Sequence, residues 1–192
     1  MSNTDRTNGF RPVKHMNGSP YNGQFNKYYS PNDNLFMHDL VEAETTGVRS
    51  GDGIYSCVDR IDAAGDVIVG VVVGWEPDPT NLGRPYHLAS STYAVYIADA
   101  RDLVMEAQSD DATMVLGDAG INISPTVTAG NTTTGASNME LDGDTAATTN
   151  TLTLRIIGAV DRPDNDATDS TSWTRWLVTI NSSAWANLIA GV

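Results

Sequence analysis

Lysine is the residue that this sequence most plainly lacks, because only Lys14 and Lys27 occur among its 192 residues. Charged residues make up 18% of the chain and hydrophobic residues 40%, so much of the polar surface must come from Thr, Ser, Asn and Gly. Lysine is a good helix former, whereas the small polar residues favour turns and the connections between strands. The composition therefore argues against an all-α protein and favours a mainly β one.

Cysteine and long apolar runs are also scarce. The single cysteine, Cys57, excludes an internal disulfide and a zinc site built from several cysteines. We expect Cys57 to be a small buried apolar residue on a strand and not a nucleophile. No run approaches the ~20 apolar residues that span a bilayer, and the first residues lack the apolar segment of a secretory signal. We therefore expect synthesis in the cytoplasm and no membrane partner.

The net charge of −13 is unevenly distributed along the chain. Residues 1–33 carry a net charge of +2, which leaves −15 for the remainder. Such asymmetry suggests a basic segment that lies on an acidic partner, joined to an acidic body that repels nucleic acid. A solvated, disordered terminus is the alternative reading of the same charges.

Residues 1–33 are rich in Asn, Gly and Pro and show neither a helical nor an alternating apolar period. They also hold too many aromatic and apolar residues for a segment that is only solvated. We therefore predict an extended N-terminal arm that docks on another protein. The residues expected to make that contact are Phe10, Arg11, Lys14, Tyr21, Phe25, Tyr28 and Tyr29.

From residue 34 to residue 192 the pattern changes to short β-type runs, beginning with 35–41 and 54–61. The run 67–73 is apolar and β-branched, which predicts a strand buried on both faces. Two more strands are expected in 93–108, broken at Asp99 and Ala100, and a helical turn in 112–121. The last strand, in 173–181, alternates and carries a tryptophan on each face. This pattern predicts a β-barrel, β-tulip-like or sandwich body with at most two short helices.

Catalytic motifs are missing. The sequence contains no G-x-S-x-G, no G-x-G-x-x-G and no phosphate-binding G-x-x-x-x-G-K-[ST]. None of His15, His38 and His87 has a second ligand at the spacing of a zinc or copper site. We therefore expect no enzyme activity, no cofactor and no metal. Two acidic clusters resemble calcium loops only in composition, and exposed turns of an acidic protein are expected to contain such residues without any metal. The clusters are Asp161, Asp164, Asp166 and Asp169, and Glu140, Asp142 and Asp144.

Several segments read together resemble a family of tailed-bacteriophage proteins, the capsid decoration or cement proteins encoded near the major capsid protein. The resemblance runs from about Gly9 to Asn181. Its segments are NGFRPVKHMNGSPYNGQFNKYY, LFMHDLV, AAGDVIVGVVVGWEPDP, YAVYIADARDLVMEAQ, NTTTGASNMELD, LRIIGAVDRPDND and WTRWLVTINSS. The most specific of them are the NGFRPVKHMNGSPYNGQ segment and the RPDN loop before WLVTIN. The resemblance implies a β body on the outside of a capsid and an arm that crosses subunit boundaries, with no catalytic residues.

The expected function is therefore that of a virion structural protein that stabilises the expanded head by bridging subunits. The expected partners are the major capsid protein and further copies of the chain itself, as a dimer or trimer on the lattice. Direct nucleic-acid binding is not expected, although aromatic and basic residues alternate in residues 1–33 as in single-strand binding platforms. A tail, connector or fibre component of the virion is the first alternative. A carbohydrate-binding module that uses the four tryptophans is the second.

Overall fold

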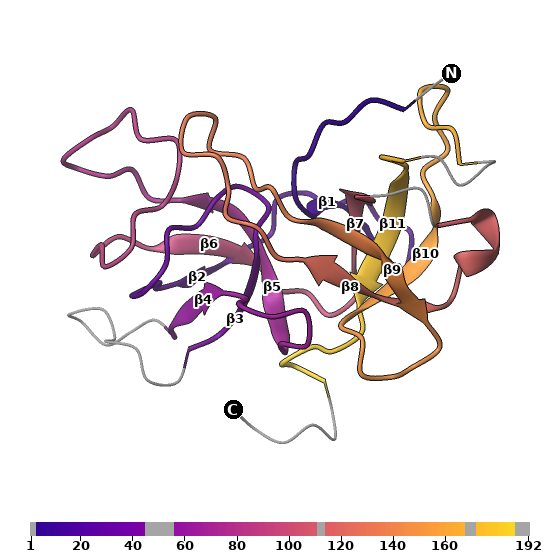
Figure 1. Cartoon of the computed structure of the whole chain (residues 1–192). Helices are drawn as coiled ribbons and strands as arrows, with labels where there is room; N and C mark the ends of the chain where they lie inside the picture. The colour runs from indigo at the N-terminus through magenta and orange to yellow at the C-terminus, as the bar shows by residue number, and fades with distance from the viewer. Residues whose placement is uncertain (1–2, 45–55, 111–113, 168–171, 187–192) are drawn as a thin grey trace.

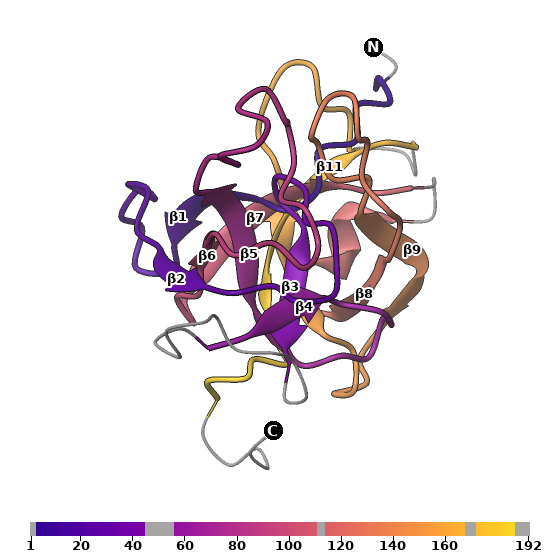
Figure 2. The same cartoon turned by 90° about the vertical axis from the view of Figure 1, so that its left-hand side faces the viewer.

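The computed structural model describes residues 3–44, 56–110, 114–167 and 172–186, which form two antiparallel sheets (Figures 1 and 2). The six-stranded sheet contains, in spatial order, β1 (Arg11–His15), β7 (Leu103–Gln108), β11 (Arg175–Ile180), β10 (Leu154–Ala159), β8 (Asn122–Thr126) and β9 (Glu140–Ala147). The five-stranded sheet contains β2 (Asn26–Tyr28), β6 (Val95–Ala98), β5 (Ile68–Trp75), β3 (Leu40–Ala43) and β4 (Val58–Arg60). The predicted mainly β class is confirmed. In the described residues the body is sandwich-like, and neither sheet closes into a barrel.

The main hydrophobic core lies between the two sheets. Leu40, Ile68 and Val71 from the five-stranded sheet belong to the same buried cluster as Met105 and Trp176 from the six-stranded sheet. Each of these five side chains is fully buried. Facing apolar surfaces of two sheets form one core in this way because each sheet removes the inner face of the other from water.

The five-stranded sheet is also buried on its other face. Val69 and Val72 on β5 and Val41 on β3 belong to a second cluster, separate from the one between the sheets. The register of β5 against β6 shifts between Val72 and Gly74, so the strand carries a bulge. The prediction of a strand buried on both faces is confirmed, because successive side chains of a strand point to opposite faces and both faces here are covered.

The last strand confirms the predicted alternation, but the prediction of a tryptophan on each face is wrong, because β11 begins at Arg175 and Trp173 lies before it with a left-handed backbone. Trp176, Val178 and Ile180 on β11 are buried, while Arg175, Leu177 and Thr179 are partly exposed. Other boundaries also agree with the sequence pattern. β6 ends at Ala98 and β7 begins at Leu103, and the helical turn expected in 112–121 is a 3₁₀ turn, η1 (Leu116–Asp118).

The strand predicted over 35–41 is wrong, because β3 begins only at Leu40. His38 adopts a left-handed backbone conformation with φ 73°, which interrupts an extended strand. The Asp39 carboxylate accepts a hydrogen bond from the Phe36 backbone N–H at 2.9 Å and closes a turn there. In the predicted strand 54–61, β4 starts at Val58, and residues 54 and 55 lie outside the described residues.

Residues 3–33, which belong to the predicted arm, run through both sheets of the body. β1 pairs with β7 in one sheet, and β2 pairs with β6 in the other. The N-terminal segment also packs tightly on the body at Gly9, which has φ +58°. A Cβ at this position would collide with the His38 carbonyl oxygen and the Ser137 side chain. The chain's own sheets therefore hold much of the segment that the sequence assigned to a partner. That it also contacts a capsid lattice stays a prediction.

Candidate functional site

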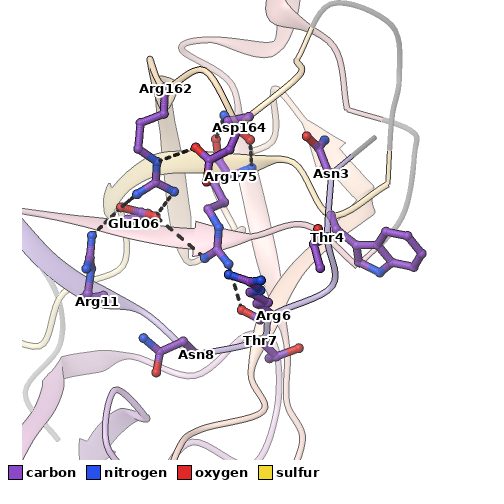
Figure 3. A pocket seen from close by; sticks show the side chains of 13 residues that line it. Asn3, Thr4, Arg6, Thr7, Asn8, Arg11, Glu106, Arg162, Asp164 and Arg175 are labelled. Carbon is purple, nitrogen blue, oxygen red and sulfur yellow. Dashed lines mark hydrogen bonds and ion pairs between the residues drawn. The ribbon is translucent and has the colours of Figure 1, made fainter. Parts of the chain in front are cut away.

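A recess of about 620 Å³ opens beside β1, β7 and β11 of the six-stranded sheet (Figure 3). Its walls are residues 3–9 of the N-terminal segment and the loop that connects β10 to β11. Four arginines line it, out of only eleven lysines and arginines in the chain. We call it the arginine pocket. Its lining residues are Asn3, Thr4, Arg6, Thr7, Asn8, Gly9, Arg11, Glu106, Arg162, Asp164, Asn165, Trp173 and Arg175.

Glu106 lies at the centre of the arginine pocket. Arg11 stands directly opposite Glu106 in the pairing of β1 with β7, and its Nη2 lies 2.8 Å from Glu106 Oε2. Arg162, from the β10–β11 loop, donates from Nη2 to Oε1 at 2.8 Å and from Nη1 to Oε2 at 3.4 Å. The Glu106 side chain is only 6% exposed. A nearly buried carboxylate thus binds one guanidinium with both oxygens and a second with one, the geometry for which the planar arginine fork is suited.

Arg175 and Arg6 extend the positive charge along the pocket wall. Arg175 begins β11, and its Nη1 lies 3.8 Å from Glu106 Oε1. Its Nη2 donates a 3.0 Å hydrogen bond to the backbone carbonyl of Arg6, which holds the N-terminal segment against the strand. Among the described residues, the Arg6 side chain makes no ion pair of its own, and Arg6 is exposed. One carboxylate in the floor is therefore shared among three guanidinium groups, and a fourth stands nearby.

Two asparagines fasten the walls of the pocket. Asn165 Nδ2 donates to the carbonyls of Val160 and Arg175, while its Oδ1 accepts from the Arg175 N–H. Asn3 Nδ2 donates to the Asp166 carbonyl at 2.9 Å, and Asn3 Oδ1 accepts from the Asp166 N–H at 2.7 Å. The Asn165 bonds hold the β10–β11 loop to the start of β11, and the Asn3 bonds join the N-terminal segment to that loop, so the arginines are positioned before any ligand arrives. Such pre-organisation lowers the entropic cost of binding.

A second polar network anchors the N-terminal wall. The Gln108 side chain, 2% exposed, accepts from the Arg6 N–H and donates to Asp5 and to Glu140. Thr7 also donates to Glu140, at 3.0 Å. Burial raises the pKa of Glu140, an effect that the hydrogen bonds from Thr7 and Gln108 oppose. The network connects residues 5–7 to β7 and β9, so the pocket wall is part of the folded sheet.

Trp173 forms the apolar part of the pocket lining. It is 39% exposed, and it has a left-handed backbone with φ 61°. A bulky side chain seldom adopts this conformation, and such strain is concentrated at functional sites. An exposed tryptophan beside arginines is the composition of an interaction hot spot.

The chemistry of the arginine pocket is that of anion binding. Four guanidinium groups meet two carboxylates, Glu106 and Asp164, so the lining carries an excess of positive charge. Arg162 Nε lies 3.5 Å from Asp164 Oδ1, and this aspartate is 78% exposed. The Glu106 oxygens already accept from arginines, so this carboxylate serves as a counter-ion. The arrangement is suited to holding a further anion and not to transferring a proton.

The seven residues predicted for partner contact do not form one surface. Arg11 alone lines the arginine pocket, while Phe10, Tyr28 and Tyr29 are buried in the chain's own body. The Tyr28 hydroxyl donates to Asp99 at 2.6 Å, and burial together with the Asp99 carboxylate raises the pKa of Tyr28.

The other predicted contact residues are partly accessible. Phe25 is 46% exposed and stacks on Tyr96 with ring centroids 4.4 Å apart. Tyr21 is half-buried beside the main core, and Lys14 lies on β1. Their roles in binding a partner stay predictions, and only Arg11 coincides with the pocket.

The remaining candidates of the sequence have local roles. Cys57 is buried, as predicted. His87 is fully buried with Nε2 3.1 Å from the Tyr93 carbonyl, and His15 pairs with Asp102 at 3.0 Å. In the described residues, which omit Asp169, no three His, Cys, Asp or Glu side chains are placed to hold a metal ion.

Sequence reasoning missed most of the arginine pocket. Arg6, Arg162 and Arg175 were not singled out, although Arg162 belongs to the RPDN loop, one of the most specific parts of the family resemblance. The available signal was the scarcity of basic residues, since each arginine of a strongly acidic chain is then worth locating. Glu106 and Trp173 gave no signal that separates them from ordinary strand and loop residues.

No family model matches the chain, and neither a curated protein nor a solved structure matches it. Within the described residues, no helix has the length and apolar character needed to cross a membrane.

Proposed function

We propose that this chain is a virion structural protein, a decoration protein that binds the outer surface of a capsid and stabilises the expanded head. The observation that carries the proposal is the arginine pocket, a pre-organised basic recess on an otherwise acidic β body. A protein whose task is attachment needs such a complementary patch, because opposite potentials steer association and set its orientation.

The sandwich-like body also supports a structural role. Its two sheets share one core, and the segment before β3 contributes a strand to each of them. Hydrogen bonds from Arg175 and to Gln108 hold the backbone of Arg6 against the six-stranded sheet. The family resemblance names the major capsid protein as the partner and further copies of the chain as neighbours on the lattice.

A binding assay with whole particles tests the proposal. The purified chain is mixed with expanded capsids assembled from the major capsid protein encoded beside it, and the particles are sedimented. We expect saturable binding in fixed proportion to the capsid subunits, and a higher temperature of capsid disruption. Failure to sediment with capsids would refute the proposal. Far fewer copies per particle, confined to a tail or connector, would favour the alternative virion role.

Deleting residues 1–33 is not a suitable test. The deletion removes β1, β2 and the fully buried Phe10 together, so the body itself would unfold. Substitutions of exposed arginines separate attachment from folding, because they leave the two sheets intact.

A further inference from the structure

The residues that line the arginine pocket carry more positive than negative charge, with four arginines against Glu106 and Asp164. Glu106 is the shared ion-pair partner of Arg11, Arg162 and Arg175. Asp164, which is largely exposed, is a second partner of Arg162. Arg11 keeps 49% of its side chain exposed and Arg162 keeps 35%, so a ligand can reach both side chains from solvent. Each guanidinium has five N–H donors, more than Glu106 uses.

The shape of the pocket limits what it can take. A volume of about 620 Å³ lies within the usual range for ligand pockets, ~300 to 1,000 Å³, and it holds a short stretch of chain or a small molecule. Asn3, Thr7 and Asn8 add neutral polar groups to the walls, and Trp173 adds an apolar surface. The lining therefore offers charge, hydrogen bonds and apolar contact side by side, which matches a peptide better than a bare inorganic ion.

The charge of the whole molecule argues against a nucleic acid as the occupant. Outside residues 1–33 the chain carries a net charge of −15, and a long polyanion would have to lie near that surface. Repulsion between charges acts over a screening length of ~8 Å at physiological ionic strength. A short segment with one or two carboxylates reaches the recess without placing further negative charge along the acidic body.

We propose that the arginine pocket binds an extended acidic segment of a partner protein, with its carboxylates on Arg6 and Arg11 and its apolar flank on Trp173. This inference rests on the proposed function for the identity of the partner, namely an outward-facing loop of the capsid subunit. The hydrogen bond from Arg11 to Glu106 shows that the Arg11 guanidinium is oriented to bind a carboxylate.

The test uses two libraries of capped hexapeptides that share random flanking positions. One library carries Asp or Glu at two central positions, and the other carries Asn or Gln there. Binding to the ¹⁵N-labelled full chain is followed through the indole N–H of Trp173 and the Nε–H signals of the arginines. We expect the acidic library to shift these signals and the amide library to leave them unchanged, with binding weakened by added salt.

Two variants and one control locate the binding. Arg6→Gln and Arg11→Gln should each weaken binding of the acidic library about tenfold, the loss of one charge-assisted contact. Arg101→Gln makes the same change of charge at an exposed arginine that does not line the pocket, and it should bind normally. Equal binding of both libraries, or undiminished binding by the Arg6 and Arg11 variants, would overturn the inference. Binding of a single-stranded oligonucleotide in place of the acidic library would also overturn it.

The particle assay separates this inference from the proposed function. If the Arg6→Gln/Arg11→Gln double variant loses the peptides but still coats capsids, the pocket is not the attachment site and the decoration role stands. If the native chain binds acidic peptides but never capsids, the pocket inference stands and the decoration role fails.

Discussion

The arginine pocket and the edge formed by β3 and β4 treat charge in opposite ways. In the pocket, three arginines share one nearly buried carboxylate. At the edge, which we call the acidic edge, the carboxylates of Glu42, Glu44, Asp59, Asp62 and Asp66 are gathered together. Glu42 stands directly opposite Asp59 in the strand register, where like charges destabilise a sheet.

The difference shows how one fold accommodates a cluster of positive charges in one place and a cluster of negative charges in another. The pocket neutralises part of its charge with an internal counter-ion, whereas the acidic edge raises its proton affinity. Burial, followed by the charges of Asp66, Asp62, Glu44 and Asp59, raises the pKa of Glu42 to about 7. Burial raises the pKa of Asp59 to about 6, although hydrogen bonds from Asn32 oppose the shift. We therefore expect the stability of the arginine pocket to depend on Glu106, and the stability of the acidic edge to depend on pH.

Removing the counter-ion should have the largest effect. Glu106→Gln leaves Arg11, Arg162 and Arg175 around a neutral side chain, and we expect the free energy of unfolding to fall by about 3 kcal/mol. For a domain of this size the melting temperature should fall by roughly 6 to 12 °C. Thermal unfolding at pH 7 followed by circular dichroism measures it.

Glu76→Gln is the matched control for Glu106, because it breaks the exposed ion pair with Lys27. Exposed pairs contribute ~0 to 1 kcal/mol, so this variant should melt close to the native chain. An equal loss in both variants would contradict the special role of the buried carboxylate.

Removing one guanidinium should cost less. Arg162→Gln breaks the two-pronged contact with Glu106 but leaves Arg11 and Arg175 beside it. We expect a loss of about 1 to 2 kcal/mol in urea denaturation, since the carboxylate keeps other partners. A loss as large as that of Glu106→Gln would show that Arg162 alone balances the buried charge.

Neutralising the acidic edge should stabilise the protein increasingly as the pH rises above about 4.5, with the full gain reached above about pH 7. The pKa of Glu42 is raised on folding, so the folded state binds more protons and stability falls as pH rises from about 4.5 through 7. We expect Glu42→Gln to raise the melting temperature by about 2 to 4 °C at pH 8, roughly 1 kcal/mol after allowance for solvent screening, and to change little at pH 4.

Asp144→Asn on β9 is the control for Glu42→Gln, because it removes the same charge from an exposed position on the other sheet. It should show no comparable gain between pH 4 and pH 8. A gain of equal size would mean that net charge, and not the arrangement of the acidic edge, limits stability.

Salt should produce the smallest effect. Added NaCl shortens the range of repulsion between partly exposed carboxylates and acts less on the nearly buried Glu106. At pH 8 we expect 0.5 M NaCl to stabilise the native chain by a few tenths of a kcal/mol, and Glu42→Gln by less. A larger stabilisation by salt in Glu42→Gln than in the native chain would show that the repulsion does not arise at the acidic edge.

Local pattern was enough to locate most of the strands. The β-branched run of β5, the alternation of β11 and the break between β6 and β7 were readable because side chains in a strand repeat with period two and turns have characteristic residues. The strand expected at 35–41 failed where His38 turns the backbone, since a left-handed histidine leaves no mark in a hydropathy pattern.

The N-terminal segment shows the limit of composition. Its Gly, Pro and Asn content predicted an extended arm outside the body, yet the segment contributes β1 and β2 to the two sheets. Its aromatics predicted contact with a partner, and Phe10 and Tyr28 are buried in the chain's own body. What covers those aromatics was not readable, because a buried ring has the same composition in its own core as in an interface. The structure places Phe10 and Tyr28 in the chain's own clusters.

The amino-acid sequence alone establishes an acidic, mainly β protein with few basic residues and an apolar strand at its centre. Only the tertiary structure brings Arg6, Arg11, Arg162 and Arg175 around Glu106. The spatial order β1, β7, β11 creates that meeting. This order arises because strands that are distant in the chain pair with one another and because both sheet faces are buried. Neither cause produces a periodic pattern in the sequence around the arginines.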